Sequence, residues 1–100
     1  MARYRLTADA QRDLETIREY ILNDNPQRAV SFVDELIARF RSLAERPMSF
    51  RGRDELSPGL RSAAHGNYII LFRPEQDFVK ILRVVHGARN LPRVVEDTPE

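Results

Sequence analysis

The sequence contains no cysteine, and lysine occurs only once among its 100 residues. Without cysteine the chain cannot form disulfides, thiolate zinc sites or a cysteine nucleophile. No apolar run approaches the roughly eighteen residues that a membrane span requires. The N-terminal residues also lack the apolar segment of a signal peptide. These absences predict a soluble, intracellular (cytoplasmic) protein with no membrane partner.

The remaining composition is that of one small globular domain, which we expect to span residues 1–100. Hydrophobic residues make up 42% of the chain, enough for a core and too many for wholesale disorder. The net charge is only +1, yet residues 46–93 hold nine basic and four acidic side chains. Almost all the basic residues are arginines, whose planar forks suit carboxylates and phosphates. A GC-rich gene would produce the same bias, so arginine content alone does not assign recognition.

The first half of the chain predicts a short strand and two helices. Residues 2, 4 and 6 alternate with arginines, as in a half-buried strand. Thr7 is a suitable N-cap for a first helix, whose apolar stripe is Ala10, Leu14, Ile17 and Ile21. Asn25 and Pro26 begin a second helix, which Pro47 ends. Its apolar face comprises Ala29, Val33, Leu36, Phe40 and Leu43, widened by Val30 and Ile37.

Because the connection is short, the two helices should form an antiparallel hairpin. Residues 48–59 have no period and predict a loop. Strand-like runs at 60–64, 68–73 and 78–85 are separated by short turns, which predicts an antiparallel meander ending at 86–90. The expected fold class is α+β, in the order β-α-α-β-β-β, with the helical hairpin packed on a small antiparallel sheet. The segment after Asn90 lies outside this meander and should matter little for folding.

Catalytic and metal-binding patterns are scarce. There is no Ser-His-Asp arrangement, glycine-rich phosphate loop or paired-carboxylate spacing, and two histidines 21 residues apart make a poor metal set. We therefore expect no catalytic site, metal or cofactor. His65 is interpreted as a surface turn residue. His86 could act as a general acid or base, although a hydrogen bond to the turn that it begins is favoured.

Arginines are the strongest candidates for a functional site. Arg61 and Arg83 lie on predicted strands, Arg89 follows the last strand, and Arg51 and Arg53 lie in the long loop. Strict alternation puts Arg83 on the same apolar face as Ile81 and Val85, where a charge must be paired or used. The structural alternative is an ion pair with Asp54, Glu55 or the acidic tail. The helix carboxylates, Asp13 among them, are interpreted as solvent-facing.

Several spaced motifs, taken together, resemble the RelE/ParE toxin superfamily and its ParE branch in particular. They cover nearly the whole chain. They are YRLTxxAxxDLxxIxxYI at 4–21, PxxA at 26–29, LxxxP at 43–47, GLR at 59–61, YIILFR at 68–73 and VxILRVVHGARN at 79–90. The opening helix pattern and the closing VVHGARN are the specific parts.

The resemblance implies a toxin of a bacterial type II toxin–antitoxin module, neutralised by a ParD-like antitoxin and meeting DNA only through it. ParE-like toxins act on DNA gyrase by binding, whereas RelE-like relatives cleave mRNA on the ribosome with basic residues and a C-terminal Tyr or His. No Tyr follows the last strand here, which favours binding. The alternative is an endonuclease that uses Arg61, Arg83 and His86. Expected target-binding residues are Arg61, Arg83, His86, Arg89 and Arg93, and expected antitoxin-binding residues are Leu14, Ile17, Val33 and Ile37.

Overall fold

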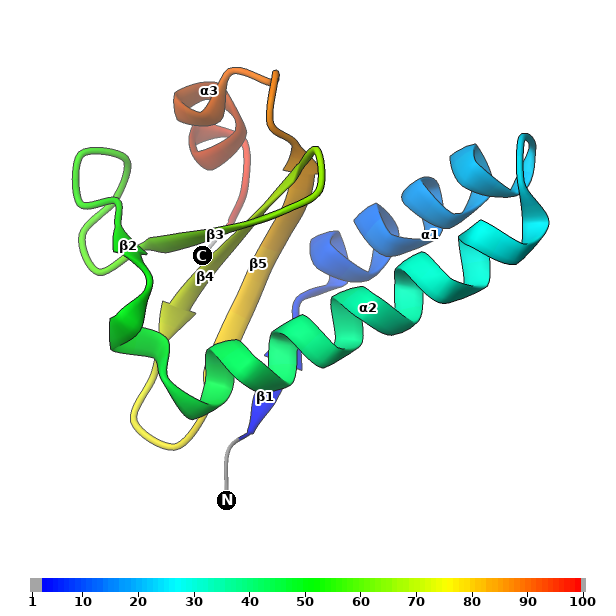
Figure 1. Ribbon diagram of the computed structural model, residues 1–100. Coiled ribbons are helices and arrows are strands. Elements are labelled where there is room, and N and C mark those ends of the chain that lie inside the picture. Colours follow the sequence, from blue (N-terminus) through cyan, green and yellow to red (C-terminus); the bar gives the residue numbers. More distant parts are fainter. Residues whose placement is uncertain (1–2, 100) are drawn as a thin grey trace.

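The computed structural model describes residues 3–99 and confirms the α+β class, with the helical hairpin followed by the strand meander (Figure 1). Ala2, expected in the first strand, lies outside the described residues. In chain order the elements are β1 (Tyr4–Leu6), α1 (Ala8–Leu22), α2 (Pro26–Glu45), a 3-10 turn η1 (Pro47–Ser49), β2 (Arg51–Gly52), β3 (Arg61–His65), β4 (Tyr68–Pro74), β5 (Val79–His86) and α3 (Leu91–Glu96). Of these, η1, β2 and α3 were not expected from the sequence.

The five strands form one mixed sheet in the order β1-β5-β4-β3-β2. The β3–β4 and β4–β5 pairs are antiparallel, as predicted. The expectation of a purely antiparallel sheet is wrong at one edge, where β1 runs parallel to β5 with Tyr4 opposite Val79. Parallel neighbours require a crossover connection, and the chain between these two strands, including the helical hairpin, provides it.

Side-chain caps fix where the helices begin. The Thr7 hydroxyl accepts a hydrogen bond from the Ala10 amide at 3.0 Å, and Asn25 accepts one from the Arg28 amide at 3.0 Å, with Pro26 in the first turn. Both caps were predicted, because short polar side chains satisfy amides that lack intrahelical partners. Asn90 caps α3 in the same way.

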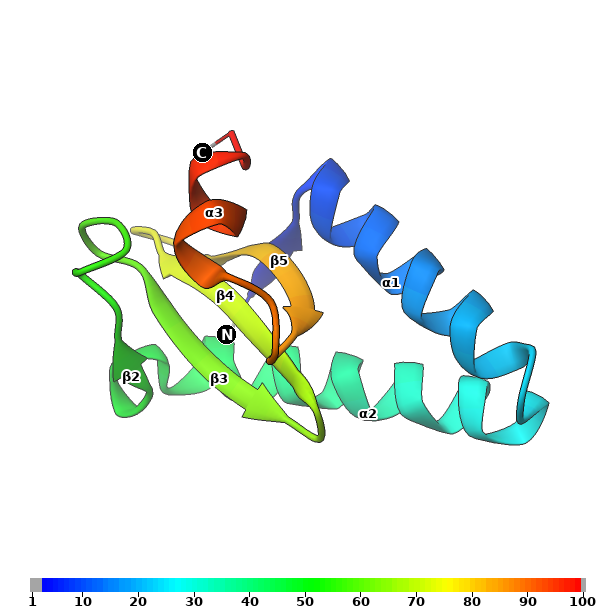
Figure 2. The ribbon, with the colours of Figure 1, turned by 90° about the horizontal axis from the view of Figure 1, so that it is seen from above.

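The sheet is covered on both faces (Figure 2). On one face α1 and α2 pack against it through a core that includes Leu36, Phe40, Phe72 and Ile81. On the other, α3 covers a second core formed by Leu60, Leu71, Leu82, Val85 and Val94. Val94 is only 2% exposed. The expectation that the segment after Asn90 lies outside the fold is therefore wrong, because this segment supplies one wall of a core.

The predicted apolar face of α2 is also wrong in one respect. Val30 was expected to widen that face, yet it is 63% exposed, whereas the unpredicted Phe32 is buried. Phe32 packs against Tyr68 with ring centroids 5.5 Å apart, so the start of α2 faces the end of the sheet.

A β-bulge in β5 resets which side chains face which core. Leu71 pairs with Arg83 and Phe72 with Ile81, so that Leu82 is an extra residue between them. Ile81 therefore belongs to the core under the helices, while Val85 belongs to the core under α3. Arg83 lies opposite Leu71, on the α3 side. The expectation that Arg83 shares a face with both Ile81 and Val85 is wrong, because strict alternation fails at the bulge.

Candidate functional site

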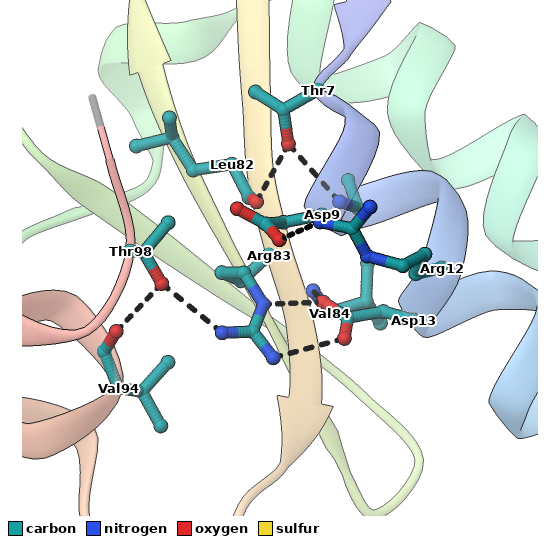
Figure 3. Close-up of polar contacts among 10 residues, drawn as sticks. Thr7, Asp9, Arg12, Asp13, Leu82, Arg83, Val84, Val94 and Thr98 are labelled. Atoms are coloured by element: carbon teal, nitrogen blue, oxygen red, sulfur yellow. Dashed lines mark hydrogen bonds and ion pairs between the residues drawn. The ribbon is translucent and has the colours of Figure 1, made fainter.

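Arg83 is held in a two-pronged ion pair with Asp13 of α1 (Figure 3). Its Nε and Nη2 donate to the two carboxylate oxygens at 2.7 and 2.9 Å. The Val84 amide also donates to Asp13, at 2.9 Å. The two side chains are only 16% and 14% exposed. Hydrogen bonding to Asp13 raises the pKa of Arg83 despite the opposing effect of burial, so the guanidinium stays charged.

The third nitrogen of Arg83 points toward the segment that follows α3. Nη1 donates to the Thr98 hydroxyl at 3.0 Å, and that hydroxyl donates to the Val94 carbonyl at 2.6 Å (Figure 3). Arg83 thus connects α1 to the end of α3. The sequence pointed to Asp54, Glu55 or the acidic tail as structural partners and to a solvent-facing Asp13. The partner is instead Asp13 itself, assisted by Thr98.

Three further arginines fasten the segment from residue 50 to 60 onto the sheet. Arg61 donates to the Phe50 carbonyl at 2.6 Å, and Arg53 donates to the Ser62 hydroxyl at 3.3 Å. Arg73 donates to the Pro58 carbonyl and to the Ser57 hydroxyl. Arg53 also pairs with Glu55 at 2.8 Å and lowers the pKa of that carboxyl, while Arg51 is exposed. Arg61 therefore has a structural role, because it holds the start of this segment against β3.

His86 begins the turn that follows β5, and its own side chain closes that turn. The Ala88 amide donates to Nδ1 at 3.1 Å, and the Arg89 amide donates to the His86 carbonyl at 3.0 Å. The imidazole also meets the edge of Tyr68, with ring centroids 5.6 Å apart. This is the turn-forming role that the sequence favoured. A proton-transfer role would break the Ala88 hydrogen bond whenever Nδ1 took up a proton.

His65 is more than a surface turn residue. Its Nε2 lies 3.3 Å from Glu35, and its ring lies 5.4 Å from the ring of Phe32 on α2. Arg28 donates to the same Glu35 at 2.5 Å, and this hydrogen bond lowers the pKa of the carboxyl. The β3–β4 turn is thereby joined to the helical hairpin.

A groove of about 750 Å³ lies between the helical hairpin and the end of the sheet where β4 begins and β5 ends. We call it the hairpin groove. Apolar and aromatic side chains line it, together with two arginines, Arg28 and Arg89, and with His86. Burial raises the pKa of Tyr68 in its wall, and Tyr20 on its rim is 74% exposed. An open groove with an apolar lining and a few polar groups is suited to binding a peptide segment.

The four residues expected to bind an antitoxin do not form one surface. Ile17 lines the hairpin groove, although it is only 5% exposed. Leu14 and Val33 line a smaller depression of about 370 Å³ that also includes Glu15 and Arg18. Ile37 is half-buried and lines neither depression.

The five residues expected to bind the target divide into two kinds. Arg61 and Arg83 have structural partners, as described above. His86, Arg89 and Arg93 are exposed near the end of the sheet and on α3. Arg93 lies 3.9 Å from Asp97, a solvent-exposed pair of the kind that contributes little.

Sequence reasoning missed the importance of Asp13, Thr98, Tyr20 and Tyr68. Asp13 and Tyr20 both stand in the opening helix motif, but only the tertiary structure reveals their neighbours. Among residues 3–99, no group of three or more His, Cys, Asp or Glu side chains could hold a metal ion, and no helix is long and apolar enough to cross a membrane.

The fold is that of the toxin chains of ParDE and RelBE toxin–antitoxin systems. A chain of the chromosomal ParDE system from P. aeruginosa is 22% identical, with a TM-score of 0.73 over 86% of this chain and 96% of that one. A chain of the toxin–antitoxin complex RelBE2 from Mycobacterium tuberculosis is 28% identical, with a TM-score of 0.58 over 85% of this chain and 96% of that one. No curated protein matches the chain.

Residues 4–91 match the sequence family described as "ParE toxin of type II toxin-antitoxin system, parDE". This chain belongs to the ParE toxin family.

Proposed function

We propose that this toxin inhibits DNA gyrase by binding to it, without carrying out chemistry itself. The supporting observation is that the side chains that an mRNA endonuclease would use here already have structural hydrogen-bond partners. Arg83 is paired with Asp13, Arg61 holds the Phe50 carbonyl, and the Nδ1 atom of His86 accepts the Ala88 amide. General acid–base catalysis needs a positioned group that can take up or give up a proton. The lone pair of His86 that would take up a proton already accepts the Ala88 amide.

The proposed target surface comprises His86, Arg89 and Arg93, with Arg61 and Arg83 holding the structure behind it. Arg89 and Arg93 are exposed and flank the N-cap of α3. Their positive charge would attract an acidic surface or the phosphates of DNA bound to the target. The surface would therefore bind the target through direct contacts and electrostatic attraction.

We further propose that a ParD-like antitoxin neutralises the toxin in the cytoplasm, and that one of its segments occupies the hairpin groove. The groove has the apolar lining and the exposed rim residue Tyr20 that an amphipathic segment would cover. Because His86 and Arg89 also line this groove, the bound segment would lie against the proposed target surface. Occupation of the groove would then block the target.

Induced expression in bacterial cells tests the proposal. We expect growth arrest, an SOS response and gyrase–DNA cleavage complexes, all suppressed by co-expression of the neighbouring antitoxin gene. Replacing Arg89 and Arg93 together with alanine should reduce toxicity, whereas Arg41→Ala on the exposed side of α2 serves as a matched control. Normal growth without the antitoxin would argue for an inert member of the family.

The alternative function, for which the similarity to the RelBE2 complex is the support, is a ribosome-dependent mRNA endonuclease of the RelE type. In that case transcripts would be cut in translating extracts while gyrase remained unaffected. That combination would overturn the gyrase proposal.

A further inference from the structure

The two ring nitrogens of His86 have different surroundings. Nδ1 accepts the Ala88 amide hydrogen at 3.1 Å, so this nitrogen carries no proton in the neutral ring. The single proton must then reside on Nε2. Nε2 has no hydrogen-bond partner within residues 3–99. The backbone therefore selects one tautomer and leaves its N–H available to a ligand.

The turn around His86 is firmly anchored, which keeps that N–H in place. The Gly87 amide donates to the Asn67 carbonyl at 2.8 Å, tying the turn to the β3–β4 connection. A Cβ atom at Gly87 would lie 3.3 Å from that carbonyl oxygen, a tight contact that glycine avoids. The edge of Tyr68 supports the imidazole from β4, where the two residues are paired in register.

The charges along the hairpin groove indicate what would bind there. Arg28 and Arg89 contribute positive charge, although Arg28 is also paired with Glu35. Among the described residues that line the groove, Asp13 is the one with a carboxylate, and it already accepts hydrogen bonds from Arg83 and the Val84 amide. The groove thus presents donors and cations around an apolar lining, and its complement is an apolar segment that carries carboxylates.

We propose that the Nε2–H of His86, together with the guanidinium of Arg89, which lines the same groove, recognises a carboxylate side chain on the antitoxin segment in the hairpin groove. His86 is thereby a specificity residue of the antitoxin interface with a fixed tautomer. This assignment rests on the proposed function, because it takes the antitoxin as the occupant of the groove.

Two substitutions separate the two nitrogens. In His86→Asn the side-chain oxygen lies near the position of Nδ1 and can accept the Ala88 amide, as in an Asx-turn, but the donor at Nε2 is lost. In His86→Gln the amide nitrogen can approach the position of Nε2, while the short-range acceptor is lost. Both variants remove the ring that contacts Tyr68, so that contact is matched between them.

The first measurement is long-range ¹H–¹⁵N NMR of the free toxin at neutral pH, which we expect to show the proton of His86 on Nε2. The second is affinity for the purified antitoxin encoded beside the toxin gene. We expect His86→Asn to weaken the complex by about tenfold or more, the scale of a hydrogen bond to a charged group. His86→Gln should stay within about threefold of wild type, by the same energy scale, yet melt at a lower temperature.

A double-mutant cycle identifies the partner group. Each acidic residue of the antitoxin is changed in turn to its amide and tested against wild-type toxin and His86→Asn. We expect one acidic residue whose amide variant loses clearly less affinity in the His86→Asn background than against wild-type toxin, because only the contact with Arg89 then remains to be lost. A proton on Nδ1, unchanged affinity of His86→Asn, or coupling to none of the acidic residues would overturn the inference. If the wild-type toxin forms no complex with the antitoxin, the proposed function fails and the recognition with it, while the NMR result still decides the tautomer.

Discussion

Arg83 and Asp13, separated by 70 positions in the chain, form a two-pronged ion pair that also binds the backbone amide of Val84. Beyond Ile81, no strand within residues 3–99 lies beside β5 on the side where β1 ends, so this amide would otherwise be unpaired. Asp13 and the N-cap residue Thr7, whose hydroxyl donates to the Leu82 carbonyl at 2.9 Å, cover that edge from α1. The pair therefore completes the sheet as well as neutralising a charge.

Replacing Asp13 with alanine should destabilise the protein by about 3 kcal/mol, because it leaves a mostly buried guanidinium and a backbone amide without partners. Arg83→Ala should have a similar effect, since it leaves the Asp13 carboxylate partly unpaired. Urea unfolding monitored by circular dichroism measures both. Thr98→Val, which removes only the hydroxyl bridge to α3, should cost about 1 kcal/mol.

The double variant with alanine at both positions provides the control for this prediction. If the two residues act as a pair, their combined effect falls short of the sum of the single effects. Additive losses would show that each residue is stabilising through other contacts.

Val94→Ala should destabilise the fold by about 2 kcal/mol, because two buried methyl groups are lost and a cavity remains. The second core then loses contacts around Leu60, Leu71 and Leu82. Glu96→Ala on the exposed side of the same helix is the matched control and should change the melting temperature little. Removing the whole segment after Asn90 should yield poorly folded protein, and recovery of a soluble, cooperatively melting fragment would contradict this account.

Much of this arrangement is encoded locally and was predictable. Thr7 and Asn25 occupy N-cap positions because their side chains satisfy helix amides, and apolar spacing predicted both helices. The cap Asn90, Pro92 in the first turn and the spacing of Leu91, Val94 and Val95 are comparable signals for α3. They extend over only six residues, fewer than an isolated helix needs, and so the helix was not predicted.

Other features depend on contacts that no local pattern records. The parallel pairing of β1 with β5 joins distant parts of the chain, and the bulge at Leu82 depends on how β5 fits against β4. The bulge changes which face of the sheet the side chains after Leu82 point to, so the surroundings of Arg83 cannot be inferred from those of Ile81 and Val85. The groove likewise depends on the angle between the hairpin and the sheet, which is set by tertiary packing.

Tyr20→Ala should weaken antitoxin binding by about tenfold, because a bound partner can bury this exposed aromatic ring. The stability of the free toxin should be nearly unchanged, because the ring is largely exposed in the fold. Titration calorimetry with the antitoxin measures the affinity. Val30→Ala is the matched control, since Val30 is also an exposed apolar residue of the hairpin but does not line the groove. Equal effects of the two variants would place the antitoxin elsewhere on the hairpin.

Acid should weaken the contact between Arg28 and Glu35. The hydrogen bond from Arg28 lowers the pKa of Glu35 from its ordinary value of 4.5, so the stabilisation is fully present above that pH. It is lost as the pH falls through the lower pKa of the folded state. The melting-temperature difference between wild type and Arg28→Gln should therefore be largest near neutral pH and shrink below about pH 4.

Arg41→Gln removes an exposed arginine of the same helix and should show no such pH dependence. Added salt should reduce the Arg28 effect at neutral pH, because exposed charges are screened. A difference that persisted unchanged into acid would mean that Arg28 stabilises the hairpin through its packing on Phe32, whose ring centroid lies 5.0 Å away.

The pairing of β1 with β5 has a consequence for how this toxin is made. The Thr7 hydroxyl donates a hydrogen bond to the Leu82 carbonyl, 75 positions later in the chain. Asp13 likewise pairs with Arg83, which lies in β5 beside Leu82. During translation the helical hairpin leaves the ribosome with its sheet-facing side uncovered, since β3, β4 and β5 have not yet emerged. Contacts this far apart in sequence form late and slowly. The nascent chain therefore has no complete hairpin groove until β5 has left the ribosome and paired with β1 and β4.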